Sequence, residues 1–518
     1  MKHSGLVPIA VMAVSALAPQ GAAQAQPSSS GTALWVTFME NLDLQFNTPP
    51  YFELVISSDV STQGEVQVPY TGFAIPFTVQ AQDDTVITLP TNIYYPQGDE
   101  AIFNFGLRVV ADDPVSVYAY HHRLYFSEAC MALPAERLGA EYLVLAHEDA
   151  VATQPSSFAV LATMDSTVVE VVPSVLTVGF RPPGVPYTVL LNAGQVFQQQ
   201  AFGDLSGSRV RSSDALKPIA VFAGAKQARV NCALSADDHL FQQVEPLSGW
   251  GRIFRIVPFL GRGGDELRVL ASVDGTTVEL TGQAPVVVDS GEVASFFAAV
   301  PLTVQSSAPV AVGQFNDSQS CNPAMGDPCY LWVHPFDRTD QRVIWTALTG
   351  AGTPYHYVNI VAQGEAGPPV VLLDAVDISA QLQPMAGVSG VFWGQFPVSA
   401  GLHRVESAQG FQAWAYGMGD YNSYAFPLGY GTADLTTSML PASGSGAAPG
   451  AWVLASGTVL DRTLAGLPPM AALVLHDAAG RVVRRFGPGE VLRVPDGAGS
   501  YTLLAPGSAT APVRVLVH

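Results

Sequence analysis

Residues that could do acid–base or metal chemistry stand in three short groups of this 518-residue chain. They are the pair His121-His122, the run Asp237-Asp238-His239 and the loop Gly261-Arg-Gly-Gly-Asp-Glu266. Adjacent residues on a strand face opposite sides, so His121 and His122 cannot easily coordinate one metal ion together. We interpret the pair as an ordinary loop or edge position rather than a metal site.

The other two groups lack the partners that their chemistry needs. Asp237-Asp238-His239 is accompanied by neither a D-x-D-x-D-G calcium loop nor a G-x-S-x-G nucleophile elbow. The Gly261 loop lacks the Lys-Ser/Thr of a phosphate-binding loop. A turn is the simpler interpretation of both. A pair of carboxylates for glycoside hydrolysis would leave no local signature, and nothing in the sequence singles one out.

Aromatic side chains give the remaining hint of a binding surface. Trp414, Tyr416, Tyr421 and Tyr424 cluster in the sequence, and Trp393 lies upstream. Exposed aromatic rings bind sugars or protein partners, whereas most aromatic residues lie in a core or at a sheet edge. We keep these five residues as candidate binding residues, with burial as the alternative.

The chain contains four cysteines, and an even count in an exported chain suggests disulfides. Cys321 and Cys329 bound a compact, turn-rich segment, so we expect them to pair. Cys130 and Cys232 either pair with each other or stay free. No tight C-x-x-C spacing is present, so we expect neither a bound metal nor another cofactor.

Residues 1–25 are typical of a signal peptide. Lys2 and His3 are followed by an apolar run from Leu6 to Ala18 and by the small-residue motif Ala23-Gln-Ala25. The apolar run is shorter than the roughly 20 residues that span a bilayer. No later stretch is long and apolar enough, so we expect an exported chain without a membrane span.

The composition predicts a folded protein rich in short strands. The chain is 48% hydrophobic and only 13% charged, which favours buried cores over disorder. Its 48 glycines and 39 prolines suit many strands joined by turns. The net charge of −20 excludes a nucleic-acid partner, because phosphates are bound by clusters of Lys and Arg.

Internal repeats indicate the domain organisation. The segment Phe158-Ala-Val-Leu-Ala-Thr-Met-Asp is repeated as Leu267-Arg-Val-Leu-Ala-Ser-Val-Asp. A second element, with two strands separated by a turn and a proline, recurs at Pro114, Pro218 and Pro309. The spacing of roughly 90–110 residues is typical of one β-sandwich.

We therefore predict an all-β fold of tandem β-sandwich-like repeats, with three repeats in residues 31–330 and a fourth, divergent repeat in 331–431. The four repeats span about 31–130, 131–232, 233–330 and 331–431. A propeller-like ring with one repeat per blade is the alternative, although blades usually have about 40–50 residues. Residues 432–450 form a flexible linker, and residues 451–518 a small β-sandwich module.

Several of these segments resemble a known family in their order and spacing. Gly31-Thr-Ala-Leu-Trp-Val-Thr-Phe-Met-Glu-Asn41, Leu133-Pro-Ala-Glu-Arg-Leu-Gly-Ala-Glu-Tyr142 and Lys217-Pro-Ile-Ala-Val-Phe-Ala-Gly224 look like the N-terminal domain of IgGFc-binding proteins. The likeness covers roughly residues 31–330. It implies an extracellular, adhesive role without catalysis, in a bacterial member of the family. Family members often carry a further cysteine near Asp238-His239 to pair with the equivalent of Cys232, and this chain does not.

The C-terminal module resembles the sorting domain of the type IX secretion system. Asp477-Ala-Ala-Gly-Arg-Val-Val and Gly499-Ser-Tyr-Thr carry the likeness, although the usual Pro-Asn-Pro opening is absent. The resemblance implies that the secretion machinery is a partner and that the chain is attached to the outer-membrane surface or released.

The sequence thus predicts a secreted or cell-surface adhesin or binding protein without catalytic activity, whose ligand is an extracellular protein or a glycan. One alternative is a structural envelope protein that associates with itself. A carbohydrate-active enzyme with a carboxylate pair hidden in the sequence ranks last.

Overall fold

The computed structural model describes residues 30–433 except for 43–49, 91–94, 149–153, 235, 236, 323, 349, 351 and 366, and beyond them seven strands between residues 452 and 517. The chain divides into two compact units, residues 1–438 and 439–518. The expected signal peptide, residues 1–25, lies outside the described residues, as does all but the first two residues of the expected linker, 432–450.

The described residues form an all-β protein, which confirms the predicted fold class. Helical structure in this part of the chain is limited to the single 3-10 turns Ala135–Arg137, Leu247–Gly249 and Ser379–Gln381. No helix among the described residues is long and apolar enough to cross a membrane.

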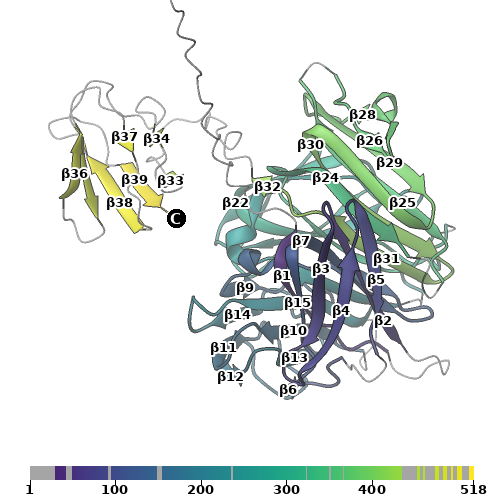
Figure 1. Ribbon diagram of the computed structural model, residues 1–518, viewed down its shortest axis with the longest axis horizontal. Coiled ribbons are helices and arrows are strands. Elements are labelled where there is room, and N and C mark those ends of the chain that lie inside the picture. Colours follow the sequence, from purple (N-terminus) through teal and green to yellow (C-terminus); the bar gives the residue numbers. More distant parts are fainter. Residues whose placement is uncertain are drawn as a thin grey trace, which may run out of the picture. The chain divides into compact units, whose positions relative to one another are not determined.

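The strands of the first unit follow the sequence in four groups, coloured from purple to green in Figure 1. Group one contains β1 (Gly31–Val36), β2 (Tyr51–Ser58), β3 (Thr62–Val68), β4 (Phe73–Val79), β5 (Asp83–Thr88), β7 (Leu107–His122) and β8 (Glu128–Met131). Group two contains β6 (Ala101–Phe103), β9 (Glu141–Leu143), β10 (Ser156–Ala162), β11 (Thr167–Val172), β12 (Tyr187–Leu191), β13 (Val196–Ala201), β14 (Arg209–Ser212), β15 (Ile219–Ala228) and β16 (Asp238–Val244).

Group three contains β17 (Gly251–Ile256), β18 (Asp265–Ala271), β19 (Thr276–Leu280), β20 (Val286–Val288), β21 (Val293–Ala298), β22 (Leu302–Phe315) and β23 (Tyr330–Val333). Group four contains β24 (Arg338–Ala347), β25 (Tyr355–Gln363), β26 (Leu372–Leu373), β27 (Val376–Asp377), β28 (Gln383–Pro384), β29 (Val391–Val398), β30 (Gly401–Gly419), β31 (Asn422–Leu428) and β32 (Thr432–Ala433). The second unit contains β33 (Trp452–Leu454), β34 (Val459–Leu460), β35 (Leu473–Asp477), β36 (Val482–Phe486), β37 (Leu492–Arg493), β38 (Gly499–Leu504) and β39 (Val513–Val517).

Long, bent strands organise groups one, three and four. The first half of β7 pairs with β1 and β3, and its second half pairs with β2 and β8. We expected proline to separate two strands at this place, yet β7 runs through Pro114 and β22 through Pro309. The register of β1 against β7 shifts beside Pro114, and such a bulge accommodates a residue that has no N–H to donate.

The four groups close into a ring around four short inner strands, β8, β16, β23 and β31. Each inner strand forms a hairpin with the preceding strand of its group. Strand β8 lies against β16 and β31, and β23 lies against the same two strands. Figure 1 shows group one flanked by the teal group two and the green group four. The sandwich-like repeats are therefore not a linear array, because their inner strands contact one another in a closed cycle.

A buried carboxylate ties three inner strands together. Glu128 of β8 is fully buried, and its side chain accepts hydrogen bonds from the amides of Ala129 at 2.9 Å, Tyr330 at 2.7 Å and Ala425 at 3.2 Å. Gln242 of β16 donates to the carbonyls of Ala129 and Ala425 at 2.7 and 2.8 Å. One polar centre thus joins all four inner strands.

The hydrophobic cores lie between neighbouring groups rather than inside single repeats. Each of the four clusters of buried apolar residues draws on two groups: one and two, two and three, three and four, and four and one. The last of these joins Tyr118 and Tyr120 of group one to Tyr424 and Phe426 of group four. No repeat therefore completes its core without its neighbours.

A second buried network lies where the chain leaves the inner strands. Glu245 is 1% exposed and accepts hydrogen bonds from His334 at 2.5 Å and from Arg338 at 2.7 Å. The guanidinium groups of Arg338 and Arg137 lie over the ring of Tyr430, at 5.2 and 4.8 Å from its centre. Burial alone would raise the pKa of Glu245, but Arg338 and His334 outweigh it and lower the pKa to about 2.

Replacing Glu245→Gln should therefore lower the free energy of unfolding by roughly 3–5 kcal/mol at pH 7, because it leaves the buried guanidinium of Arg338 without its counter-charge. The pKa is lowered by folding, so the stabilisation is present above about pH 4.5 and is lost as the pH falls towards 2. Urea denaturation at several pH values measures the difference. Glu170→Gln, which breaks an exposed pair with Arg211, serves as the control and should cost about 1 kcal/mol or less. Equal effects of the two substitutions would contradict the network.

Candidate functional site

The structure buries the histidine pair at the end of β7, where the sequence predicted a loop or edge position. The two rings point to opposite sides, as the strand geometry required. His121 packs against the rings of Phe52 and His239, at 4.7 and 5.1 Å between centres. His122 lies 3.0 Å from a carboxylate oxygen of Glu53. No three His, Cys, Asp or Glu side chains gather in a metal-binding arrangement among the described residues.

Asp238 and His239 lie in the same closed interior. Asp238 accepts a hydrogen bond from the His239 amide at 2.6 Å, and the His239 ring bonds to the Ala225 carbonyl at 2.9 Å. Burial lowers the pKa of His239 to about 3 and raises the pKa of Asp238 well above its usual value. Both side chains are 0% exposed. This pair is part of strand β16, not the turn that the sequence suggested, because β16 begins at Asp238.

The cysteine pairing differs from the prediction. Cys232 is bonded to Cys321, whereas Cys130 and Cys329 are free and buried, so the expected Cys321–Cys329 bond is wrong. Cys329 is 0% exposed at the start of β23, inside the core that groups three and four share. Its position in the inner layer takes it away from the surface loop that carries Cys321. The bond joins the loop after β15 to the loop after β22, 89 residues apart in sequence.

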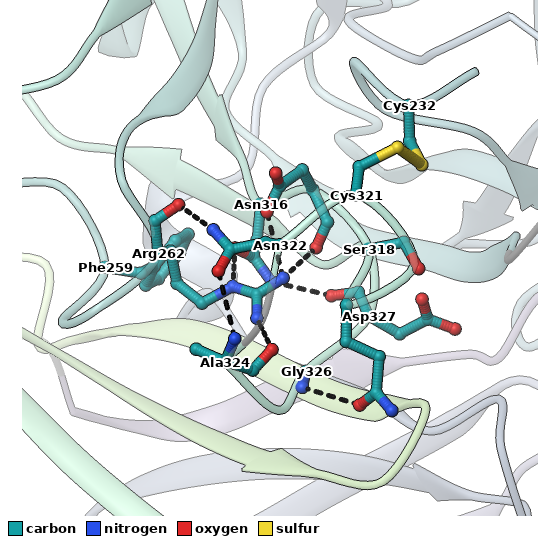
Figure 2. A network of polar contacts seen from close by, with 12 residues as sticks. Cys232, Phe259, Arg262, Asn316, Ser318, Cys321, Asn322, Ala324, Gly326 and Asp327 are labelled. Atoms are coloured by element: carbon teal, nitrogen blue, oxygen red, sulfur yellow. Dashed lines mark hydrogen bonds and ion pairs between the residues drawn. A yellow bond between two sulfur atoms is a disulfide. The ribbon is translucent and has the colours of Figure 1, made fainter. Parts of the chain in front are cut away.

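Arg262 holds the loop that carries Cys321 (Figure 2). Its side chain is 1% exposed. It donates to the Asn316 side chain at 2.9 Å, to the Met325 carbonyl at 3.0 Å, and to both the carbonyl and the carboxylate of Asp317 at 2.7 and 2.9 Å. The Gly261 loop therefore has a structural role, because its Arg262 holds the loop that carries Cys321. A single guanidinium group thus bonds to four residues of this loop: Asn316, Asp317, Ala324 and Met325.

The aromatic candidates do not form a common surface. Trp414, Tyr416 and Tyr424 are at most 4% exposed and belong to the cores on either side of group four. The hydroxyl of Tyr416 donates to Asn359 at 3.0 Å, and His356 and the Tyr424 hydroxyl lie 2.9 Å apart. The proposed aromatic binding surface is therefore wrong for these three residues, because β30 and β31 are covered on both faces. Trp393 is partly buried, and only Tyr421 is exposed, at 39%.

A polar cleft of about 560 Å³ opens between groups two and three, at the disulfide. It is lined by His147, Glu148, Asp204, Arg229, Asn231, Cys232, Glu266, Arg268 and Ser295. The residues come from the loops of group two and from strands β18 and β21 of group three. No single repeat supplies both sides of the cleft, which is why local motifs did not reveal it.

Arg268 is the residue that joins the two sides of the cleft. It is 6% exposed and donates to the Ala146 carbonyl at 2.6 Å and to the carboxylate of Asp204, both in group two. Its own strand supplies Glu266, whose carboxylate lies 3.9 Å from the Arg268 guanidinium and 3.7 Å from the His147 ring. A charged residue in the apolar repeat Leu267-Arg-Val-Leu, where the other copy has Ala159, was the available sequence signal.

The electrostatics of the cleft favour binding over acid catalysis. Burial alone would raise the pKa of Asp204 and of Glu266, but Arg268 and His147, respectively, outweigh it and lower both values. These two carboxyls are therefore ionised at neutral pH. Glycoside hydrolysis needs a pair in which one carboxyl keeps its proton, and this pair does not supply it.

A second ion pair shapes the wall of the cleft. Arg229 bonds both carboxylate oxygens of Asp237, at 2.7 and 3.0 Å, and so closes the base of the loop between β15 and β16. The disulfide fastens the same loop through Cys232. The wall is thus held at Asp237 and at Cys232.

Removing the disulfide by Cys232→Ser or Cys321→Ser should lower the free energy of unfolding by about 2–4 kcal/mol, since the bond restrains a long loop of the unfolded chain. Thermal unfolding with and without a reducing agent measures the loss. In reducing buffer, the wild type and the variants should unfold at the same temperature. A peptide map that finds Cys321 bonded to Cys329 would contradict the pairing.

Comparisons with known proteins place this architecture in a family. The profile of the IgGFc binding protein family matches residues 128–417, which is more than half of the chain. The match begins later and ends later than the range of 31–330 that the sequence suggested. The IgGFc-binding protein of Homo sapiens is 33% identical over 162 residues, or 31% of this chain and 3% of the human protein.

A solved structure that aligns with the chain is too dissimilar to indicate its fold. The native conformation of E. coli alpha-2-macroglobulin aligns with 95% of this chain and 40% of that chain, at 9% identity and a TM-score of 0.14, which is too low to indicate a shared fold. The family assignment therefore rests on the sequence match, which covers most of the ring from Glu128 of the first inner strand to Gly417 of β30. On this match, the chain belongs to the IgGFc-binding protein family.

Proposed function

We propose that this chain is a secreted or cell-surface binding protein of the adhesin type, which recognises an extracellular protein or a glycan and catalyses no reaction. The observation that carries the proposal is the cleft between groups two and three. It is polar, and the ion pairs of Asp204, Glu266, Arg229 and Arg268 preorganise it. Preorganised polar groups bind a ligand without the cost of ordering their own side chains.

The residues that could act in acid–base catalysis are buried in the interior of the ring. His121, His239 and Asp238 are all 0% exposed inside the ring. Burial keeps the imidazole of His239 neutral by lowering its pKa to about 3. A buried, neutral histidine in a packed interior supports strand packing and has no substrate within reach. This arrangement supports binding rather than catalysis.

The family supports an extracellular partner. The human relative is named for binding the Fc part of IgG, and the matching segment is only a small part of that protein. Fc is therefore one candidate partner of this chain, beside mucin, matrix proteins and glycans. The resemblance of the second unit to a sorting domain supports export, and its strands β35 and β36 pair antiparallel. We propose that this unit brings the chain to the outer-membrane surface.

Binding is tested with residues 26–518 and with residues 26–438, which lack the second compact unit. Each form is immobilised and exposed to IgG Fc, mucin, fibronectin and a glycan array. We expect saturable binding of one partner class, equal in both forms, with the partner recovered chemically unchanged. Produced in its host, the shorter form should be missing from the cell surface. Binding to none of the partners, or cleavage of one, would contradict the proposal.

A further inference from the structure

We propose that the cleft between groups two and three binds a neutral carbohydrate, and that the ring of Phe297 is its stacking platform. The proposal rests on the proposed binding function and deepens it, because it assigns a site and a ligand class. Three observations carry it: the register of strands β18 and β21, the packing of Phe297 on Gly264, and the mixture of donors and acceptors in the cleft.

The register places an aromatic ring beside the charged floor of the cleft. In the antiparallel pair β18–β21, Arg268 is opposite Ser295 and Glu266 is opposite Phe297. Side chains of cross-strand partners lie on the same face of a sheet, so Phe297 stands next to Glu266 on the face that lines the cleft. Phe297 is 53% exposed, although it is a large apolar side chain.

The Phe297 ring packs against Gly264 of the Gly261 loop. Gly264 has a φ of +138°, and a Cβ atom at this position would lie 2.5 Å from Cζ of Phe297. Only glycine therefore allows the ring to pack on the backbone of the Gly261 loop. The Cζ and Cε1 end of the ring thus lies against Gly264, and the residue remains 53% exposed. An exposed aromatic ring beside a polar cleft is suited to the apolar face of a sugar ring.

The polar groups suit hydroxyls, which both donate and accept hydrogen bonds. Asn231 and Ser295 line the cleft and are exposed. The amide of Asn231 and the hydroxyl of Ser295 can each donate to a sugar hydroxyl and accept from one. The carboxylates of Glu266 and Glu148 can accept from a hydroxyl, and Glu148 is exposed. A sugar hydroxyl uses both kinds of group, whereas a cation would use only the acceptors.

The charges in and beside the cleft disfavour an anion. Arg229 is bound by both oxygens of Asp237, and Arg268 is bound by Asp204 and by the Ala146 carbonyl. An anion would therefore have to compete with four carboxylates that lie in or beside the cleft, those of Glu148, Asp204, Asp237 and Glu266. Its size, about 560 Å³, leaves room for one or two sugar residues.

The test uses residues 26–518 and the free disaccharides of glucose, galactose, mannose, N-acetylglucosamine and N-acetylgalactosamine. Saturation-transfer difference NMR finds the sugar that binds, and calorimetry gives its Kd. We expect Phe297→Ala to weaken binding about tenfold. Phe297→Tyr should keep it, because the flat ring is retained. Tyr70→Ala is the matched control, since Tyr70 is 51% exposed in the turn after β3 of group one. It should leave the Kd unchanged.

Two further measurements identify the ligand class and its source. Raising NaCl from 50 to 500 mM should leave the Kd of the sugar unchanged, because the ligand carries no charge. A mucin that loses binding after periodate oxidation would show that the sugar is recognised on a glycoprotein, and unchanged binding of the free disaccharides would show that the glycan alone suffices.

Three results would overturn the proposal. They are no binding of any disaccharide, equal weakening by Phe297→Ala and Tyr70→Ala, and salt-sensitive binding of a lysine decapeptide in place of a sugar. In each case the wider proposal is judged separately. If Fc, fibronectin or mucin stripped of glycans still binds, the chain is a binding protein whose site lies elsewhere.

Discussion

The closed ring depends on one buried carboxylate. Glu128 is removed from water, which raises its pKa, and hydrogen bonds from the amides of Ala129, Tyr330 and Ala425 oppose that rise. A buried acceptor that lost these donors would be costly, so the three inner strands must keep their positions relative to it. Gln242 applies the same constraint to the fourth strand. The polar centre thus selects one arrangement of strands that apolar packing alone would leave less defined.

Ring closure also explains why the cleft exists. Each hydrophobic core is shared by two neighbouring groups, so residues far apart in sequence are forced to meet at the group boundaries. Arg268 reaches the Ala146 carbonyl across such a boundary, and the Cys232–Cys321 bond fastens the surface of the same boundary. Groups four and one are linked in a similar way: the Tyr120 hydroxyl of group one donates a hydrogen bond to the Thr346 carbonyl of group four, at 2.8 Å.

The sequence was sufficient for features that depend on local pattern. Alternating apolar residues, turn glycines and repeated prolines predicted the all-β fold. It was insufficient where the outcome depends on distant partners. Cys321 pairs with a residue 89 positions away, not with its near neighbour, because the inner strand withdraws Cys329 into the core. Trp414 and Tyr416 were candidate binding residues because aromatic residues cluster there in the sequence, yet they lie in the core that groups three and four share.

Native-state hydrogen exchange at the amides of Ala129, Tyr330 and Ala425 tests whether Glu128 holds the ring closed. All three donate to Glu128 but belong to groups one, three and four. If the ring opens as one unit, the three amides exchange with the same free energy, equal to that of global unfolding of the first compact unit. Exchange of the Tyr330 or Ala425 amide through a low-energy opening that leaves Ala129 protected would contradict a ring held together at Glu128.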